Sequence, residues 1–490
     1  MWDRYQQAVL DFVANDANHL VVQARAGSGK TAVVVAGLEL LPPQGTSILC
    51  AYNTTIAEEL KNRAPSYVAV KTLHGLGFQA LKFNLGRRKV EYVNSKGRDI
   101  AFKITSAYAY NSRRRIELKE AASAVAKLSS AAKNHAATSL EDIESLAYNY
   151  GYYTADLDPA TASELAVKCL QTATADPYNV DFDDMIYLPA KLGLSPIQYD
   201  FVVVDEAQDV NPAQLWLTRA ACRTRYLAVG DSRQVIYGFR GADTQALGRT
   251  AAELSAHVLP LSVTYRCSRA IVDHVRHMIP GLQDFEARPD APDGEVVERD
   301  TNFMLGPFGA RPDDFILSRL NEPLVKICLA LLKNGIPAVI AGRDFSRGLS
   351  ALLRRSGAST PNELRRWLNS YTEREIAKAE KHEQNDAQDQ LETILDQAAA
   401  LRALSLSVDS ISELQTTLDT MFNEEPRSDV VTLSTVHKAK GLERNRVWLL
   451  SDTFNWDRCT HDEENTYYVG CTRARTSLYL VNDILTKERD

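Results

Sequence analysis

Short apolar runs recur along both halves of the chain, and each ends in small or polar residues. The first half contains such runs at 20–22, 47–51, 68–70, 201–204 and 226–229, and the second half at 315–317, 336–341, 430–433 and 478–481. A continuous apolar run bounded by turn residues is typical of a strand that is buried on both faces of a parallel sheet. The pattern therefore predicts an α/β fold with two parallel sheets, one in each half of the chain.

Two long stretches have a helical texture instead. Residues 84–195 are rich in Ala, Lys and Arg, with helical patterns such as 116–132, and residues 346–427 are polar and dense in charge. Within the second stretch, the segment from Glu373 to Asp396 holds eight acids against three bases. That composition is typical of a solvated helical hairpin or a short coiled coil. A binding site for a partner protein is the alternative interpretation of this stretch.

A chain of 490 residues is too long for one hydrophobic core, and the alternation of sheet and helix patterns indicates where it divides. We predict that each parallel-sheet domain is interrupted by one helical insertion. The expected parts are a first sheet domain at 1–83 and 196–262 with its insertion at 84–195, and a second sheet domain at 263–345 and 428–490 with its insertion at 346–427.

Composition adds few constraints. With 45% hydrophobic and 24% charged residues, the chain has the balance of an ordinary globular protein. It contains no apolar run of about 18 residues and begins without the features of a signal peptide, so we expect a cytoplasmic protein that does not enter a membrane. The seven cysteines form no C-x-x-C pair and the nine histidines do not cluster, which predicts reduced thiols and no zinc site.

The net charge of −7 conceals a basic segment. Residues 82–135 hold thirteen Lys and Arg against four Asp and Glu, a net charge of +9, so the rest of the chain carries −16. A local basic patch is what phosphate binding requires, although such a stretch is also typical of a solvated face. The charge pattern alone leaves both interpretations open.

The first apolar run leads into a loop with the pattern of a nucleotide-binding loop. It reads Ala24-Arg25-Ala26-Gly27-Ser28-Gly29-Lys30-Thr31, and an apolar helical stretch follows it. The backbone N–H groups of such a loop and of the helix after it direct partial positive charge at a polyphosphate. We expect residues 26–31 to bind ATP, with the Lys30 ammonium on the phosphates and the Thr31 hydroxyl on Mg²⁺.

Two adjacent carboxylates follow the buried run at 201–204. Because ligands bind at the carboxyl ends of strands in parallel sheets, Asp205 and Glu206 are expected beside the loop. ATP hydrolysis needs a carboxylate that holds Mg²⁺ through water and a group that polarises the attacking water. We assign Asp205 to Mg²⁺ and Glu206 to the general base. The amide of Gln234, after the next strand, is expected to contact the nucleotide.

Aromatic and polar residues at the ends of the expected strands are candidates for binding a single nucleic-acid strand. An exposed ring offers a stacking face to a base, and small polar groups can donate to phosphates. The candidates are Tyr52, Asn53 and Thr54 after the second run, His74 at the end of a strand expected at 68–75, and Tyr237, Phe239 and Arg240 after Gln234.

Taken in order, these motifs resemble those of superfamily 1A DNA helicases of the UvrD/Rep/PcrA type. The resemblance runs from Gln6 to Arg475, and its most specific strings lie at 205–209, 230–242, 430–443 and 467–475. It implies two RecA-like domains, each with a helical insertion, and an ATP site in the cleft between them. The family's second accessory domain is much larger than 346–427, which is a reduced counterpart.

The resemblance also implies roles for residues elsewhere. The expected contacts are Gln6 and Tyr265 with adenine, Glu443 with the ribose, Arg266 with the γ-phosphate, Arg473 as the arginine finger, and Thr435 and His437 with DNA. Ala32 stands where the family has an arginine that helps sandwich the adenine, so base selectivity would depend on Gln6 and Tyr265.

The implied function is that of an ATP- and Mg²⁺-dependent DNA helicase. It would move 3′-to-5′ on single-stranded DNA and open junctions with duplex as a monomer, in DNA repair, recombination or replication, in a bacterium or a phage-infected cell. A translocase or ATPase subunit that needs a partner such as a nuclease is one alternative. A nucleotide-switch scaffold is another, disfavoured because both carboxylates and both arginines are present.

Overall fold

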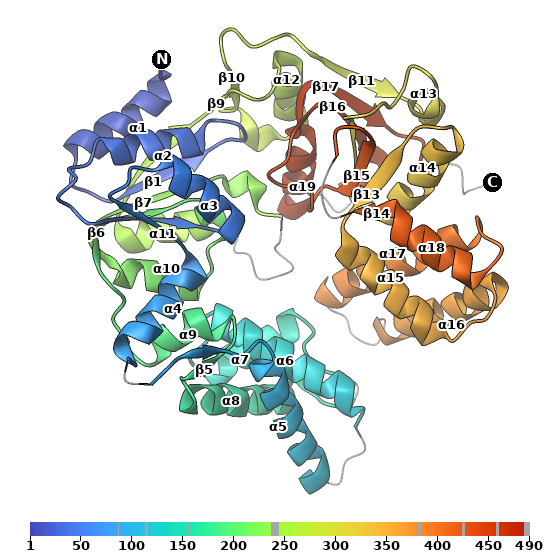
Figure 1. Cartoon of the computed structure of the whole chain (residues 1–490), viewed down its shortest axis with the longest axis horizontal. Helices are drawn as coiled ribbons and strands as arrows, with labels where there is room; N and C mark the ends of the chain where they lie inside the picture. The colour runs from blue at the N-terminus through green and yellow to red at the C-terminus, as the bar shows by residue number, and fades with distance from the viewer. Residues whose placement is uncertain are drawn as a thin grey trace. The chain divides into compact units, whose positions relative to one another are not determined.

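The computed structural model describes residues 1–86, 88–112, 116–154, 156–236, 245–379, 385–423, 427–456 and 460–484 (Figure 1). The chain forms two compact units. The first consists of Met1–Ala24 with Gly29–Leu261, and the second of Arg25–Ser28 with Ser262–Asp490. Each unit contains a large sheet whose neighbouring strands are all parallel, so the predicted α/β fold with two parallel-sheet domains is confirmed.

The sheet of the first unit has the strand order β3-β2-β6-β7-β1-β8. Its strands are β1 (Leu20–Ala24), β2 (Ser47–Ala51), β3 (Val68–Thr72), β6 (Tyr199–Val204), β7 (Cys222–Gly230) and β8 (His257–Leu261). Successive apolar residues contribute to two different cores, one on each face: Val22 and Val203 lie in one, Val21 and Val202 in the other. This alternation explains why the strands appear in the sequence as continuous apolar runs.

Helices cover both faces of this sheet (Figure 1). They are α1 (Arg4–Asn15), α2 (Lys30–Glu39), α3 (Thr54–Arg63), α4 (Leu73–Asn84), α10 (Pro212–Ala220) and α11 (Ala246–Leu254), with short 3₁₀ turns η1 (Ala207–Asp209) and η2 (Ser232–Gln234). The expectation of a strand through 68–75 is wrong beyond Thr72. The Thr72 hydroxyl accepts a hydrogen bond from the Gly75 N–H at 3.0 Å, which caps α4, so His74 lies in the first turn of a helix.

The helical insertion of the first unit has a hydrophobic core of its own, centred on residues such as Val125, Leu128 and Leu165. Its elements are β4 (Glu91–Tyr92), α5 (Lys96–Ser112), α6 (Leu118–Asn134), α7 (Leu140–Asn149), α8 (Pro159–Ala175), β5 (Asn179–Val180) and α9 (Asp184–Lys191). The short strands β4 and β5 pair in parallel.

The sheet of the second unit has the order β11-β17-β16-β12-β15-β13-β14. Its strands are β11 (Glu295–Arg299), β12 (Phe315–Ser318), β13 (Ala338–Ala341), β14 (Phe422–Asn423), β15 (Val431–Thr435), β16 (Arg444–Leu450) and β17 (Ala474–Val481), and a separate pair is formed by β9 (Val263–Thr264) and β10 (Glu286–Ala287). The helices beside them are α12 (Arg269–Met278), α13 (Thr301–Leu305), α14 (Glu322–Lys333) and α19 (His461–Cys471), with 3₁₀ turns η4 (Pro280–Leu282) and η5 (Ser451–Thr453).

The segment 346–427 is helical, as its sequence predicts. It contains most of α15 (Arg343–Ser356), then α16 (Pro361–Ala379), α17 (Asn385–Ser405) and α18 (Ile411–Met421). Leucines from all four helices, among them Leu349, Leu364 and Leu401, are buried in the same core as Ile316 of the sheet. The description as a solvated hairpin therefore fits only in part, because these helices extend the core of the second unit.

Within the described ranges, the cysteines are free thiols. No group of three or more His, Cys, Asp and Glu there has the arrangement of a metal cluster. No described helix is long and apolar enough to cross a membrane.

Candidate nucleotide and DNA-binding sites

The loop after β1 has a conformation that its glycines permit. Gly27 and Gly29 have φ angles of 72° and 77°, in the left-handed region that favours glycine. Gly29 is the N-cap of α2, so Lys30 and Thr31 form its first turn. The unpaired N–H groups and the dipole of a helix N-terminus favour an anion at this point.

Lys30 is held among carboxylates. Its Nζ lies 2.9 Å from Oε2 of Glu206. Burial by itself would lower the pKa of Lys30, but the charges of Glu206, Asp231 and Asp205 outweigh that effect and raise it. The ammonium is therefore charged, and it contacts Glu206 at the position where a nucleotide phosphate would compete for it.

The two residues predicted to hold Mg²⁺ contact each other. Burial is the main cause that raises the pKa of Asp205, to about 6, and the Glu206 charge adds to it, while Lys30 and a hydrogen bond with Thr31 act in the opposite direction. A hydroxyl beside a carboxylate offers the oxygen ligands that Mg²⁺ prefers. When bound there, the ion would neutralise negative charge on the nucleotide phosphates.

A chain of hydrogen bonds links the expected general base to Gln234. Gln208 Nε2 donates to Glu206 Oε2 at 2.6 Å, and Gln208 Oε1 accepts from the Asp231 N–H at 3.0 Å. The Asp231 carboxylate then accepts from Gln234 Nε2 at 2.8 Å. Gln208 and Asp231 were not predicted as site residues, although an amide two residues after Glu206 was a usable signal in the sequence.

Glu206 itself has an uncommon backbone conformation, with a φ of 52°. Left-handed geometry is disfavoured for residues with a Cβ and tends to occur at functional sites. It belongs to the tight turn between β6 and η1, which directs the Glu206 side chain toward Lys30.

Gln6 lies beside the loop. It is buried in α1 and forms a capping box with Asp3, whose N–H donates to Gln6 Oε1 at 3.2 Å. A Cβ added to Gly29 would lie 3.0 Å from Gln6 Nε2, so the amide reaches the start of α2. Gln6 therefore lies beside the loop that is expected to bind the nucleotide.

Four loop residues, Arg25–Ser28, belong to the second unit. The Ala26 N–H donates to the Tyr468 hydroxyl at 2.7 Å, and the Tyr265 N–H donates to the Gly27 carbonyl at 2.8 Å. A Cβ on Gly27 would lie 2.5 Å from the Arg266 Cβ, so only glycine fits there. Tyr265 and Arg266, two predicted nucleotide contacts, therefore adjoin this part of the loop.

The predicted arginines of the second unit are paired or buried. Arg266 and Arg475 both form ion pairs with Glu443, and these charges hold its pKa below the usual range despite the opposing effect of burial. Arg473 is fully buried, and its guanidinium donates to the carbonyls of Val469 and Leu442 at 3.0 and 3.1 Å. Burial is the main cause that lowers the Arg473 pKa to about 10, so this side chain is still a cation at neutral pH.

Three neighbouring strands of the first sheet bring predicted residues to one edge. Cys50 of β2 pairs with Val204 of β6, so Tyr52 and Glu206 each lie two residues beyond a paired position. Ala51 of β2 pairs with Thr72 of β3, two residues before His74. The expected general base and two expected DNA contacts therefore follow adjacent strands.

A groove with a volume of about 1160 Å³ runs from this edge to the helical insertion. Tyr52, Asn53 and His74 line it on the side of the sheet. On the side of the insertion it is lined by the exposed cations Arg98, Lys119 and Lys127 and by the exposed ring of Phe102. Aromatic rings and cations together are the components of a single-strand binding surface.

Phe182 is a groove residue that sequence analysis missed. Its ring stacks on His74, with centroids 3.6 Å apart and planes 20° from parallel. Burial lowers the pKa of His74 to about 4, so its imidazole is neutral at pH 7. The available signal was an aromatic residue between acids, Asp181-Phe182-Asp183-Asp184, at the end of the insertion.

Comparison with known proteins gives these sites a family. The UvrD/REP helicase N-terminal domain family matches residues 5–254, which is more than half of the chain, and the UvrD-like helicase C-terminal domain family matches residues 353–483. The chain belongs to the UvrD/Rep helicase family. The matched segments contain the nucleotide-binding loop, both carboxylates, the groove and Arg473.

Individual members of the UvrD/Rep family are similar over different extents. F-box DNA helicase protein 1 of Schizosaccharomyces pombe is 25% identical over 98% of this chain and 57% of that protein. The ATP-dependent DNA helicase Rep of Escherichia coli is 26% identical over 54% of this chain and 41% of its own length. RecBCD enzyme subunit RecB of Mycolicibacterium smegmatis is 32% identical over 35% of this chain and 15% of its own. The chain thus spans little more than half the length of these relatives at most.

The remaining residues expected to bind DNA in this UvrD/Rep family member differ in exposure. Thr54 is exposed, and Asn53 accepts a hydrogen bond from the Ile56 N–H at 2.8 Å as the N-cap of α3. His437 is half-buried after β15, whereas Thr435 is only 6% exposed. Tyr237, Phe239 and Arg240 lie outside the described residues.

The basic segment at 82–135 is less basic at the surface than its sequence suggests. Lys96 and Lys133 are buried and form ion pairs with Asp184, at 2.6 and 2.7 Å. Lys133 also lines the groove but is only 4% exposed, and the exposed cations of the groove are Arg98, Lys119 and Lys127. The count of charges along the sequence therefore combined an internal ion-pair network with an external cationic wall.

Proposed function

We propose that this UvrD/Rep family member hydrolyses ATP with Mg²⁺ in response to single-stranded DNA, moves 3′-to-5′ along the strand and unwinds duplex DNA at junctions. The observation that carries the proposal is the common edge of β3, β2 and β6, from which His74, Tyr52 and Glu206 follow. A change at the nucleotide has only one strand spacing, about 5 Å, to travel before it reaches a stacking residue.

In this proposal, Lys30 exchanges Glu206 for the nucleotide phosphates. The released Glu206 carboxylate then accepts a proton from the attacking water, as a general base must. Gln208 keeps the carboxylate oriented through its amide, and Gln234 contacts the γ-phosphate. Thr31 and Asp205 would hold Mg²⁺, which would neutralise charge on the phosphates.

Residues of the second unit complete the nucleotide site in the proposal. Tyr265 stacks on the adenine together with Gln6, and Glu443 accepts from the ribose. Arg266 and Arg473 stabilise the charge that develops on the transferred phosphoryl group, which commonly accelerates hydrolysis about 10³- to 10⁵-fold. Since Arg266 and Arg473 now contact Glu443 and backbone carbonyls, nucleotide binding must release them from these partners.

The groove is the proposed path of the single strand in the first unit. Rings at its edge stack on bases, and the cations of the insertion neutralise phosphates. Stacking does not depend on base identity, so binding should tolerate any sequence and weaken steeply with salt. In the second unit, His437 is the proposed contact.

A translocase that needs a partner protein is the second candidate. The short insertion 346–427, whose leucines belong to the core of the second unit, favours this alternative because little of it is left to engage a duplex. The segment would then be the surface for the partner. For either candidate we propose a monomer that acts in the cytoplasm, in DNA repair, recombination or replication.

The proposal is tested by ATP hydrolysis with and without single-stranded DNA, together with unwinding of duplexes that carry a 3′ or a 5′ tail. Hydrolysis stimulated by DNA and unwinding of the 3′-tailed substrate, both lost in Glu206→Gln, are the expected results. Stimulated hydrolysis without unwinding would favour the partner-dependent translocase. Hydrolysis that DNA does not stimulate at low salt would contradict both candidates.

A further inference from the structure

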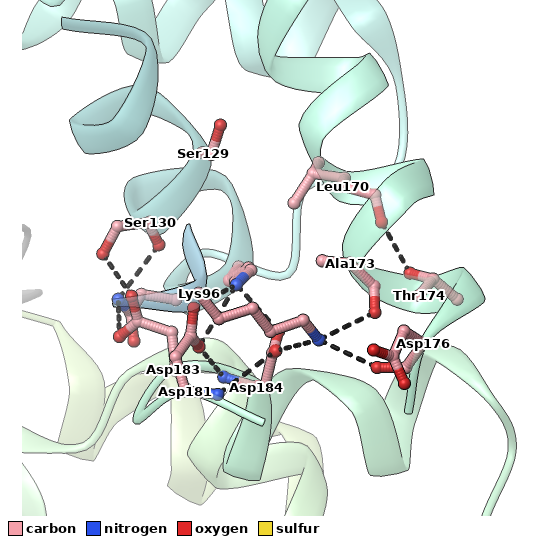
Figure 2. A network of polar contacts seen from close by, with 12 residues as sticks. Lys96, Ser129, Ser130, Leu170, Ala173, Thr174, Asp176, Asp181, Asp183 and Asp184 are labelled. Carbon is pink, nitrogen blue, oxygen red and sulfur yellow. Dashed lines mark hydrogen bonds and ion pairs between the residues drawn. The ribbon is translucent and has the colours of Figure 1, made fainter. Parts of the chain in front are cut away.

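Phe182 is exposed by 53%, yet the turn that carries it is fixed on both sides. The acids before and after it, Asp181 and Asp183, are each held by residues of α6. Figure 2 shows this polar network, with Ser130 and the acids Asp181, Asp183 and Asp184 gathered between the helices. The network therefore fixes the backbone on both sides of Phe182.

On one side, Lys133 connects Asp181 to Asp184. Its Nζ lies 3.2 Å from Asp181 Oδ2 and 2.7 Å from Asp184 Oδ1. The Asp184 N–H donates to Asp181 Oδ1 at 2.8 Å, which closes the turn around Phe182. Lys96 contacts the second Asp184 oxygen at 2.6 Å and donates to the carbonyls of Ala173 and Asp176, so the turn is tied to α5 and α8 as well (Figure 2).

On the other side, Asp183 accepts from the Ser130 hydroxyl at 2.5 Å and from Asn134 Nδ2 at 3.3 Å. Burial is the main cause that raises its pKa, and these two hydrogen bonds lower it in part. Asn134 Oδ1 in turn accepts from Asn211 Nδ2 at 3.0 Å. Asn211 follows η1, the turn after the catalytic carboxylates, so α6 links that segment to the Phe182 turn.

The helix that carries His74 is held against the same turn. A Cβ on Gly77 of α4 would lie 2.0 Å from the Met185 carbonyl oxygen of α9, so the two helices meet at backbone distance. His74 is one turn before Gly77, and Phe182 lies two residues before the first residue of α9. The separation of the two stacked rings is therefore set by backbone contacts and buried ion pairs rather than by the rings alone.

We propose that Lys133, Ser130 and Asn134 are positioning residues that hold Phe182 against His74, so that the pair forms a preformed stacking surface for a base of single-stranded DNA. The inference rests on the proposed DNA-binding function. An exposed ring on an unsupported turn would populate several conformations and would lose that freedom on binding. Loss of the support should weaken DNA binding about three- to tenfold through its effect on Phe182.

A competing explanation is that Lys133 binds a phosphate directly. Lys133 lines the groove, but it is only 4% exposed and already contacts two carboxylates. Lys127, on the same helix and in the same groove, is exposed. A residue that neutralises a phosphate changes the salt dependence of binding, and its removal lowers the slope of log K against log salt by about one. A positioning residue leaves that slope unchanged.

The test is binding of a fluorescent single-stranded oligothymidylate, measured by anisotropy over a range of salt concentrations. The variants are Phe182→Ala, Lys133→Met, the double variant Ser130→Ala with Asn134→Ala, and Lys127→Met as the matched control. The α6 variants and the Lys127→Met control are each also combined with Phe182→Ala. Thermal unfolding and circular dichroism identify the variants that fold, and Ser130→Ala with Asn134→Ala provides the test if Lys133→Met does not fold.

We expect the α6 variants to weaken binding without changing the salt slope, and to add little once Phe182 is alanine, because they act through that ring. Lys127→Met should lower the slope and weaken binding equally in both backgrounds. The inference would be overturned if the α6 variants bound DNA as tightly as the wild type, or if their effects and that of Phe182→Ala were additive. In that case the proposed function would still be supported by DNA binding of the wild type and its loss in Phe182→Ala. A wild-type protein that binds no DNA would contradict the proposed function itself.

Discussion

The first unit contains two clusters in which a buried lysine contacts carboxylates, and they differ in what surrounds them. At the nucleotide loop, Lys30 contacts Glu206 near Asp205 and Asp231. In the insertion, Lys133 contacts Asp184 and Asp181. In both clusters burial alone would lower the lysine pKa and the carboxylates raise it, so charge and burial do not distinguish them.

Exposure and backbone geometry do distinguish the two clusters. The Glu206 side chain is 27% exposed and its residue has a left-handed φ of 52°. The Asp184 side chain is 0% exposed and forms ion pairs with two lysines. Asp184 is the first residue of the helix α9. At an accessible, strained turn, a ligand can replace one partner of an ion pair. A fully buried ion pair is closed to ligands and can only hold structural elements together. The exposure and backbone geometry of the carboxylate partner should therefore be considered before a buried lysine is assigned a catalytic role.

The largest expected effect is on catalysis at the accessible cluster. Glu206→Gln removes the proposed general base and should lower the rate of ATP hydrolysis about 10²- to 10⁴-fold. The free energy of unfolding should change by less than about 1 kcal/mol, because a partly exposed ion pair contributes little stability. Steady-state hydrolysis and chemical denaturation measure the two quantities. A rate close to that of the wild type would remove the distinction between the clusters.

Lys133→Met should have the opposite profile. It leaves the Asp184 carboxylate buried without one of its cations, which should lower the free energy of unfolding by about 3–5 kcal/mol. Hydrolysis without DNA, measured on folded protein at low temperature, should stay within about twofold of the wild type, because no catalytic group is touched. Lys127→Met is the control and should change stability by less than about 0.5 kcal/mol. Equal free energies of unfolding for Lys133→Met and Lys127→Met would show that the buried Lys133–Asp184 cluster does not stabilise the fold.

Gly77→Ala tests the contact between α4 and α9, the helix that follows the turn held by the Lys133–Asp184 cluster. The added methyl group meets the Met185 carbonyl, so we expect a loss of about 1–3 kcal/mol in the free energy of unfolding. Gly248→Ala is a matched control, because a Cβ there has no neighbour within 4 Å. Denaturant titration of both variants gives the comparison, and an equal response would mean that the two helices are free to separate.

His74→Phe gives the smallest expected effect, which appears only in acid. The pKa of His74 is about 4 in the folded protein, below the ordinary 6.5, so the unfolded chain binds more protons between these values. Stability that His74 contributes is complete above about pH 6.5 and is lost as the pH falls toward 4. At pH 6 the wild type should lose up to about 1 kcal/mol relative to the variant, compared with pH 8. Identical pH dependence of the two proteins would contradict the burial of this imidazole.

The sequence by itself determined the elements and the chemistry that depend on neighbours in the chain. Continuous apolar runs specified the strands, because both faces of a parallel strand are buried. Gly27, Gly29 and Lys30 specified the loop, because its conformation and charge are local properties. Asp205 and Glu206 were found because they directly follow such a strand. Even the error at His74 was local, since the Thr72 cap that begins α4 is visible in the sequence.

Only the tertiary structure decided which distant groups meet. The stacking of Phe182 on His74 joins residues more than a hundred positions apart, and no periodicity encodes it. Lys96 and Lys133 count as surface charge in any sequence total, yet the fold buries both around Asp184. The physical reason is that a lysine is buried only when carboxylates compensate its desolvation, and the packing of α5, α6 and α9 supplies those partners.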